Sequence, residues 1–276
     1  MGIFQNNLLA GAAAAASAGG GGFYDHQIAQ SARFDRASRS RLSRTFGTPT
    51  SQKKYTLSMW LKRSLLCEDI DGESYDYMNV ICKLGGFSQG TGAALVFNQS
   101  SNEDKFSAYG FGSNSGGTKT SEGLFRDVGG FNHILFRYDT TESTAGDRIR
   151  VYVNGSQITL SGGTDPSLNS DLTRFNTAHA HYIGDSSAVS DGFDGYLAEV
   201  IFADGQSYAP TQFGESKNGV WIPKDPSGTT FGDNGFHLKF QNASALGDDS
   251  SGNNNDFTAN NMGADHQVLD SPTFGS

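Results

Sequence analysis

Short stretches in which apolar and polar residues alternate recur from about residue 31 onward. The clearest is YTLSMWLKR at 55–63. Because successive side chains of a strand point to opposite faces, this run has one apolar face and one mixed face. The apolar face carries Tyr55, Leu57, Met59 and Leu61, and the mixed face carries Thr56, Ser58, Trp60 and Lys62. We predict strands at residues 31–36, 41–46, 55–63, 79–84, 93–98, 106–111, 132–138, 148–153, 157–160, 179–184, 196–203 and 235–240.

Clusters of Gly, Ser, Asn and Asp separate these stretches, as is typical of turns. The strongest local signal is RIRVYVNGSQI at 148–158, where Asn154-Gly155 supplies the two positive-φ residues of a type I′ hairpin. About a dozen strands at this spacing predict an all-β, two-sheet sandwich. Residues 205–226 lack such alternation, and we expect a short turn and an extended linker there.

The first residues differ from the rest. Residues 1–22 carry no charge, and the apolar stretch 8–18 is too short to span a bilayer. A positive n-region is missing, and Asn6 breaks the myristoylation pattern. We predict a short Ala-rich helix and a glycine hinge that anchor the chain to a partner or to its own copies, or else a disordered tail. The anchor residues of this segment would be Ile3, Phe4, Leu8 and Leu9.

Composition and charge refine this picture. The 36 glycines among 276 residues, with only 6 prolines, exclude a collagen, and the scarcity of helix formers excludes a helical bundle. The net charge is −9, yet residues 25–63 hold nine bases and two acids. This basic segment predicts docking onto a like subunit or another acidic protein, or else arginines that alternate outward from strands. The arginines concerned are Arg33, Arg36, Arg39, Arg41 and Arg44. The acidic remainder argues against nucleic-acid binding. We expect an anchor at 1–30 and the sandwich at 31–276.

Two cysteines are too few for a disulfide framework. Cys67 and Cys82 close a loop between two predicted strands, so one bridge is possible. The alternative is a pair of reduced, buried thiols in a protein assembled in a cytosol.

Several segments follow one another in a familiar order. They are residues 55–63, 125–138, 148–156, 181–184 and 193–202. This series resembles the concanavalin A-like, laminin-G-type jelly roll. LGDDSSGNNNDFT at 246–258, followed by VLDSP at 268–272, is similar to the C-terminal end of such proteins in tailed bacteriophages, especially marine ones. The resemblance covers about residues 31–276 and implies a curved sandwich on a virion, assembled in the host cytoplasm, whose concave face or edge loops bind carbohydrate.

Catalytic signals are weak. Glucanases of this fold use an E-x-D-x-x-E strand, which the chain lacks, and Asp194 and Glu199 are five apart and face opposite sides. The G-x-S-x-G match at 86–90 precedes a predicted strand, where a nucleophile elbow requires a helix. His179 and His181 share a predicted strand face, and we interpret them as exposed histidines because no third metal ligand lies nearby. We therefore expect no enzyme.

A loop rich in oxygen ligands offers a candidate calcium site. Its ligands would be Asp248, Asp249, Asn253, Asn255 and Asp256. The resemblance implies such a calcium at the rim of the sandwich. The spacing is not that of an EF-hand, and clusters of this kind also form ordinary turns. The acidic loop 68–76 has the same two interpretations.

A carbohydrate site needs aromatic side chains that stack on sugars, beside amides or carboxylates. The candidates are Trp60, Tyr109, Tyr182, Tyr208 and Trp221, with Asn114, Asp185 and Asp191 in adjoining loops. Packing within the protein is the alternative for Trp60 and Tyr182.

Three hypotheses remain. The first is a virion protein, on a tail fibre or a capsid-attached fibre, that binds a host-surface polysaccharide through this domain and assembles as a homotrimer or other homo-oligomer. The second is a decoration or assembly module without a glycan ligand. The third is a glycan-active enzyme, disfavoured because paired carboxylates are missing. For the first two hypotheses we expect contacts with other virion proteins through the N-terminus, and in no case do we expect a membrane span.

Overall fold

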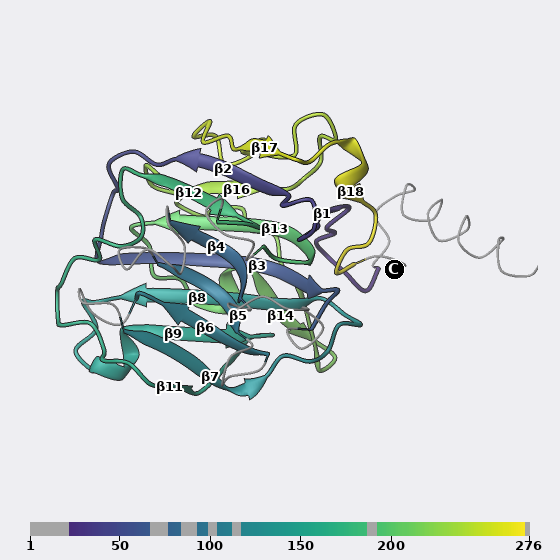
Figure 1. The fold of residues 1–276 in the computed structure, drawn as a ribbon. Helices are drawn as coiled ribbons and strands as arrows, with labels where there is room; N and C mark the ends of the chain where they lie inside the picture. Colours follow the sequence, from purple (N-terminus) through teal and green to yellow (C-terminus); the bar gives the residue numbers. More distant parts are fainter. Residues whose placement is uncertain are drawn as a thin grey trace, which may run out of the picture.

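The protein is a sandwich of two antiparallel sheets, seen in a computed structural model that describes residues 22–66, 77–83, 93–98, 104–111, 117–186 and 192–273. The first sheet has the order β10-β9-β8-β3-β13-β1-β18, with β16 also paired to β13. The second has the order β11-β7-β6-β5-β4-β12-β2-β17, which runs from bottom to top in Figure 1. The predicted all-β sandwich is therefore confirmed.

The strands are as follows. They are β1 (Ser31–Phe34), β2 (Arg41–Thr45), β3 (Lys54–Arg63), β4 (Tyr77–Lys83), β5 (Ala94–Asn98), β6 (Lys105–Tyr109), β7 (Thr118–Leu124), β8 (Asn132–Asp139), β9 (Ile149–Val153), β10 (Ser156–Gln157), β11 (Leu160–Ser161), β12 (Ala180–Ile183), β13 (Gly195–Asp204), β14 (Gly214–Lys217), β15 (Val220–Pro223), β16 (Phe236–Leu238), β17 (Thr258–Asn260) and β18 (Gln267–Val268). Among the described residues, short 3-10 helices lie at Ala145–Asp147, Pro210–Gln212 and Ala264–His266.

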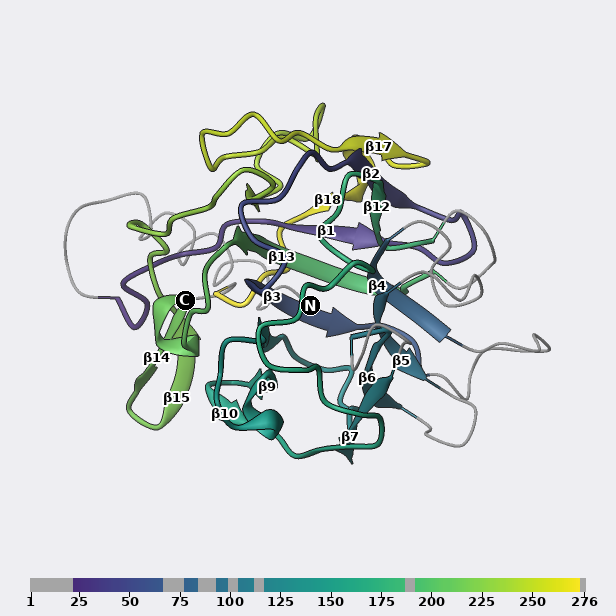
Figure 2. The same ribbon diagram turned by 90° about the vertical axis from the view of Figure 1, so that its left-hand side faces the viewer.

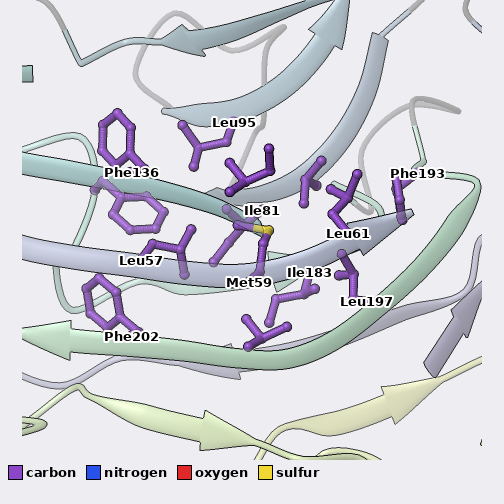
Figure 3. Close-up of a cluster of buried hydrophobic side chains, with 14 of the residues drawn as sticks. Leu57, Met59, Leu61, Ile81, Leu95, Phe136, Ile183, Phe193, Leu197 and Phe202 are labelled. Carbon is purple, nitrogen blue, oxygen red and sulfur yellow. The ribbon is translucent and has the colours of Figure 1, made fainter. Parts of the chain in front are cut away.

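The core fills the space between the sheets. The predicted apolar face of β3 contributes Tyr55, Leu57, Met59 and Leu61 to it, as the alternation required. In the close-up of Figure 3, Leu57 lies between Phe136 of β8 and Phe202 of β13, and Leu61 lies near Phe193 and Leu197. Complete burial of such side chains contributes about 1.5–3 kcal/mol each, which makes this layer the main source of stability.

The hairpin at Asn154-Gly155 is also confirmed, since Val153 of β9 pairs with Ser156 of β10. Both turn residues have positive φ, 48° and 80°. A Cβ at position 155 would lie 2.4 Å from the Trp221 ring, so glycine is required here by space as well as by conformation.

The prediction of a linker at 205–226 is wrong in part. Residues 214–223 form the hairpin β14–β15, which Figure 2 shows beyond the first sheet, on the side away from the second sheet. Its strand GESK is too polar and too short to be recognised by alternation. The strands β7, β17 and β18 were also missed, and β7 (TKTSEGL) is polar along most of its length.

Many side chains of the basic segment have partners within the domain. The side chains of Arg33 and Arg39 face Asp194 and Asp185 at 3.9 and 3.0 Å. The Arg36 backbone N–H donates to Asp194, and its guanidinium donates to the carbonyl of Gly192. The other pairs are Arg44 with the Asn255 side chain, Lys62 with Asp270, and a long contact from Arg41 to the carbonyl of Arg39. Several arginines of this segment therefore have partners inside the domain, and its role in docking stays a prediction.

The described part of the predicted anchor, residues 22–30, packs on the sandwich. Ile28 is only 6% exposed, and its backbone N–H and carbonyl both bond to the hydroxyl of Thr273. His26 Nε2 lies 2.8 Å from Glu199 Oε1. Residues in the last part of the predicted anchor therefore contact the sandwich, and the domain boundary at residue 31 stays a prediction. The anchor residues Ile3, Phe4, Leu8 and Leu9 lie outside the described residues. Within the described ranges, no helix has the length and apolar character needed to cross a membrane.

The His26–Glu199 contact predicts a pH dependence of stability. The hydrogen bond between His26 and Glu199 raises the pKa of His26 above 6.5, although burial of the ring acts in the opposite direction. Burial alone would raise the pKa of Glu199, but hydrogen bonds from His237 and His26 outweigh it and lower that pKa below 4.5. Asp225 and Lys239 also act on His26, in opposite directions. The contribution of the pair is therefore complete between about pH 4.5 and 6.5. It is lost as the pH rises through the raised pKa of His26, or falls through the lowered pKa of Glu199.

We expect His26→Gln to cost about 1 kcal/mol at pH 6 and clearly less at pH 9. Urea unfolding of wild type and variant at both pH values measures the difference. His266→Gln, a histidine beside an exposed carboxylate, is the control. An equal cost at both pH values would show that the His26 charge does not stabilise this contact.

Candidate functional site

The most suitable ligand site is an open hollow of about 400 Å³ at the edge of the second sheet. It lies where β12, β2 and β17 are neighbours. Tyr182, Ser43 and Thr258 occupy one row across these strands, since Tyr182 pairs with Ser43 and Ser43 with Thr258. The lining residues are Ser43, Arg44, Thr45, Ala180, Tyr182, Asp256 and Thr258. The hollow thus combines one aromatic ring with hydroxyl and carboxylate groups.

Packing contacts and hydrogen bonds hold the residues that line the hollow. Tyr182 is half-buried and packs against Cys82, Ala94 and Val96 on the outer face of the sheet. Asp256 Oδ1 accepts a hydrogen bond from the Asp249 N–H at 2.8 Å. A guanidinium N–H of Arg44 donates to the Asn255 side chain, while Arg44 Nη1 has no hydrogen-bond partner among the described residues. Because these groups are fixed before any ligand arrives, binding costs less ordering entropy.

This hollow unites residues that sequence reasoning assigned to different sites. Tyr182 was a candidate for sugar stacking and Asp256 for calcium, and both line it. Ser43, Thr45 and Thr258 were not predicted. Isolated hydroxyl residues in strands carry no signal of their own, and only the pairing of β17 with β2 places them beside Tyr182.

The other predicted aromatic residues lie elsewhere. Tyr109 is on the same face of the second sheet, but β4 and β5 separate its strand from that of Tyr182, about 14 Å away at ordinary strand spacing. Trp60 is only 4% exposed and packs with Ile28 and Ala198, with Trp221 against this cluster, on the outer face of the first sheet. The packing alternative therefore holds for Trp60.

The remaining sugar candidates are also accounted for. The Tyr208 hydroxyl accepts a hydrogen bond from the Thr230 N–H, and its ring packs on Phe213. Asp185 is buried against Arg39, so it is not presented to a sugar. Asn114 and Asp191 lie outside the described residues, as do Cys67, the loop 68–76 and the motif at 86–90. Cys82 is buried, and a bridge between the two cysteines stays a prediction.

The loop 247–256 is organised by its own hydrogen bonds. Asp249 Oδ1 accepts from the N–H groups of His237 and Ser251, and Oδ2 accepts from the Asn255 N–H and the Ser251 hydroxyl. The remaining predicted ligands bond within the protein as well. Asp248 accepts from Asn242, and the Asn253 and Asn255 amides donate to backbone carbonyls. Over the described ranges, no three His, Cys, Asp or Glu side chains are placed to hold a metal. The turn interpretation accounts for this loop, and calcium stays a prediction.

The histidine prediction is wrong for His181. Its ring is buried and stacks on Phe46 with centroids 3.7 Å apart. His179 is exposed and precedes β12, so the two residues do not share a strand face. Alternation fails here because the strand starts one residue later than predicted.

A serine and a histidine meet on the outer face of the first sheet. Ser58 Oγ lies 2.8 Å from His133 Nε2, while the Trp221 indole donates to His133 Nδ1 at 3.0 Å. Because the indole N–H only donates, Nδ1 must accept, and Nε2 carries the proton that Ser58 accepts. Burial lowers the pKa of His133 to about 3. This pair is therefore not a nucleophile with its base.

The two carboxylates considered for glycosidase chemistry have separate partners. Asp194 accepts hydrogen bonds from Ser64 and Arg36 at the beginning of β13. Glu199 has a φ of 46° at a bulge in β13 and contacts His26 and His237. They do not flank a common space in which a sugar would be cleaved.

Comparisons with known proteins agree with this architecture. A family model described as the concanavalin A-like lectin/glucanases superfamily matches residues 39–206. No curated protein matches the chain. A "putative carbohydrate binding protein" of Bacteroides ovatus is 16% identical, with a TM-score of 0.56, and the match covers 85% of this chain and 59% of that one.

Two further structures are less similar. A heptameric SAP-like pentraxin from Limulus polyphemus is 11% identical, with a TM-score of 0.44 over 68% of this chain and 81% of that one. The enzymatically active domain of tailspike protein 2 from bacteriophage CBA120 is 16% identical, with a TM-score of 0.41 over 63% of this chain and 25% of that one. At 16% identity, the similarity to the Bacteroides protein shows a shared fold.

Proposed function

The chain belongs to the concanavalin A-like lectin/glucanase superfamily, and we propose that it is a carbohydrate-binding protein without catalytic activity. The observation that carries the proposal is the hollow beside Tyr182. Sugar rings present apolar faces for stacking and hydroxyls for hydrogen bonds, and this hollow offers both kinds of partner. The lining of this hollow is more polar than that of the hollow of about 270 Å³ near Leu61 and Phe97, which is mainly apolar.

The absence of catalysis is part of the proposal. It is supported by the separate partners of Asp194 and Glu199 and by the tautomer of His133, all in the described part of the chain. The description of the Bacteroides protein, which shares the fold, also favours binding over cleavage.

We further propose that the protein acts on the virion of a tailed bacteriophage, where it attaches to a polysaccharide of the host surface. Support comes from the resemblance of residues 246–258 and 268–272 to phage proteins and from the uncharged N-terminal segment, which suits contact with other virion proteins. A decoration or assembly module without a glycan ligand is the alternative, and the binding experiment separates the two.

The test is binding of the fluorescently labelled full chain to an array of bacterial surface polysaccharides, with calcium and with chelator. We expect saturable binding that Tyr182→Ala weakens about tenfold or more, because a stacked ring at the centre of a site contributes about 1.5–2 kcal/mol. Tyr182→Phe keeps the ring and is expected to bind normally. Loss of binding in chelator would support a calcium site at 248–256.

Tyr24→Ala, a half-buried tyrosine near the N-terminus, is the matched control and should leave binding unchanged. Thermal unfolding of all three variants checks that they fold. If the wild-type protein bound no polysaccharide, the carbohydrate-binding proposal would fail and the decoration module would be favoured. Equal binding of Tyr182→Ala and wild type would remove this hollow as the site.

A further inference from the structure

We propose that the hollow beside Tyr182 continues into a second hollow, and that the two are subsites for one oligosaccharide of at least two sugar units. The inference rests on the proposed carbohydrate-binding function and names its ligand more closely. It also assigns a role to His179, the exposed histidine of the predicted pair.

The second hollow has a volume of about 500 Å³ and a lining of mixed polarity. The residues that line it are Thr48, Pro49, Thr50, Ser51, Gln52, Lys53, Asp171, Thr177 and Ala178. Hydroxyl and amide groups predominate, and Lys53 and Asp171 form an ion pair of 3.5 Å at its rim. Such a surface can donate to and accept from sugar hydroxyls at many points.

The two hollows are neighbours along both segments that line them. Thr45 and Ala180 line the first, and Thr48 and Ala178 line the second. Three residues span at most about 11 Å and two at most about 7 Å, so the hollows adjoin. In Figure 1 the connection from β2 to β3 runs down the left side of the molecule, where β12 begins.

Between the hollows, the Phe46 N–H donates to the His179 carbonyl at 3.0 Å and joins the two segments. The side chain of Phe46 is buried, whereas His179 is exposed. Thr177 Oγ1 lies 3.3 Å from His179 Nδ1 and restricts the orientation of the ring. A ligand that occupies both hollows must pass beside His179.

The second hollow is rigid as well. The buried carboxylate of Asp204 accepts hydrogen bonds from the N–H groups of Thr50 and Ser51 at 2.7 and 3.2 Å. These bonds hold the backbone of the lining, so both subsites are formed before binding. Each occupied subsite then adds favourable contacts without a further ordering cost.

The experiment uses oligosaccharides of increasing length, prepared from a polysaccharide that the wild-type protein binds, and measures their affinities by calorimetry. We expect the affinity of the wild type to rise about tenfold or more from one sugar unit to several. His179→Ala and Gln52→Ala should reduce the affinity for long oligosaccharides about fivefold or more, and that for a single unit by a smaller factor. Tyr182→Ala should weaken binding at every length.

Gln27→Ala, an exposed glutamine outside both hollows, is the matched control and should have no effect. An affinity independent of length would overturn the inference, as would unchanged binding of long oligosaccharides by both His179→Ala and Gln52→Ala. In either case the single site beside Tyr182 would still stand. Only a wild-type protein that binds no saccharide at all would remove the proposed function.

Discussion

Replacing Asp104 with alanine is expected to lower the free energy of unfolding by about 3–5 kcal/mol. Asp104 lies at the start of β6, and its Oδ1 accepts from Arg63 Nη2 at 2.8 Å. The two side chains are 0% and 2% exposed, and Arg63 also donates to the carbonyl of Phe125 and lies over the Phe97 ring. Without this carboxylate, the Arg63 guanidinium stays buried between the sheets and loses the opposite charge of Asp104. Water reaches this position poorly, so it does not replace the lost ion pair.

Thermal and urea unfolding measure this loss, which corresponds to a decrease in Tm of about 6–20 °C. Arg126→Ala is the matched control: Arg126 contacts the same carboxylate at 3.2 Å but is exposed, so its removal should cost less than about 1 kcal/mol. The double variant Arg63→Met with Asp104→Leu removes both charges and should be more stable than Asp104→Ala alone. If Asp104→Ala lowered the free energy of unfolding no more than Arg126→Ala, the burial of the Arg63–Asp104 ion pair would not determine its contribution to stability.

The second large effect is expected at Asp204, at the end of β13. Its Oδ2 accepts from the N–H groups of Thr50 and Asn234, and its Oδ1 accepts from the Ser51 N–H and the Asn176 amide. Alanine at this position leaves several buried donors without an acceptor, at about 1–3 kcal/mol for each one that water does not reach. We therefore expect Asp204→Ala to cost about 4 kcal/mol, measured by urea unfolding.

Two further variants sharpen this prediction. Asp204→Asn retains one acceptor oxygen but replaces the other with an NH2 group, which cannot accept from the N–H groups around it. We therefore expect an intermediate loss of stability. Asp233→Ala removes an exposed carboxylate nearby and should change stability by less than about 0.5 kcal/mol. Equal stabilities of Asp204→Ala and Asp233→Ala would mean that the segment 50–51 is held by other contacts.

Local patterns predicted most of the strands correctly. Alternation assigned the apolar face of β3, and Asn154-Gly155 placed the β9–β10 hairpin, because both signals lie within a few neighbouring residues. Alternation did not predict the strands that lack an apolar face. The sequence GESK of β14 and the three-residue β17 are stabilised by their pairing partners, so they carry no periodic signal.

The candidate site was predicted only in pieces. Tyr182 and Asp256 were each selected for their chemistry, but for different sites. Their proximity follows from the order β12-β2-β17, which joins segments far apart in the chain. The partners of the arginines in β1 and β2 were not predicted for the same reason: a charge count along the sequence does not show which distant segment will fold against them.

The sequence by itself thus determined the fold class and the inward face of the central strands, since an apolar stripe must be buried wherever its strand pairs. Only the tertiary structure decided what covers the outward faces. Trp60 and His133 are buried there by packing with Trp221 of the β14–β15 hairpin, while Tyr182 lines an open hollow. Alternation assigns a side chain to one face of a sheet, but its exposure depends on distant segments that pack on that face, and local periodicity carries no information about them.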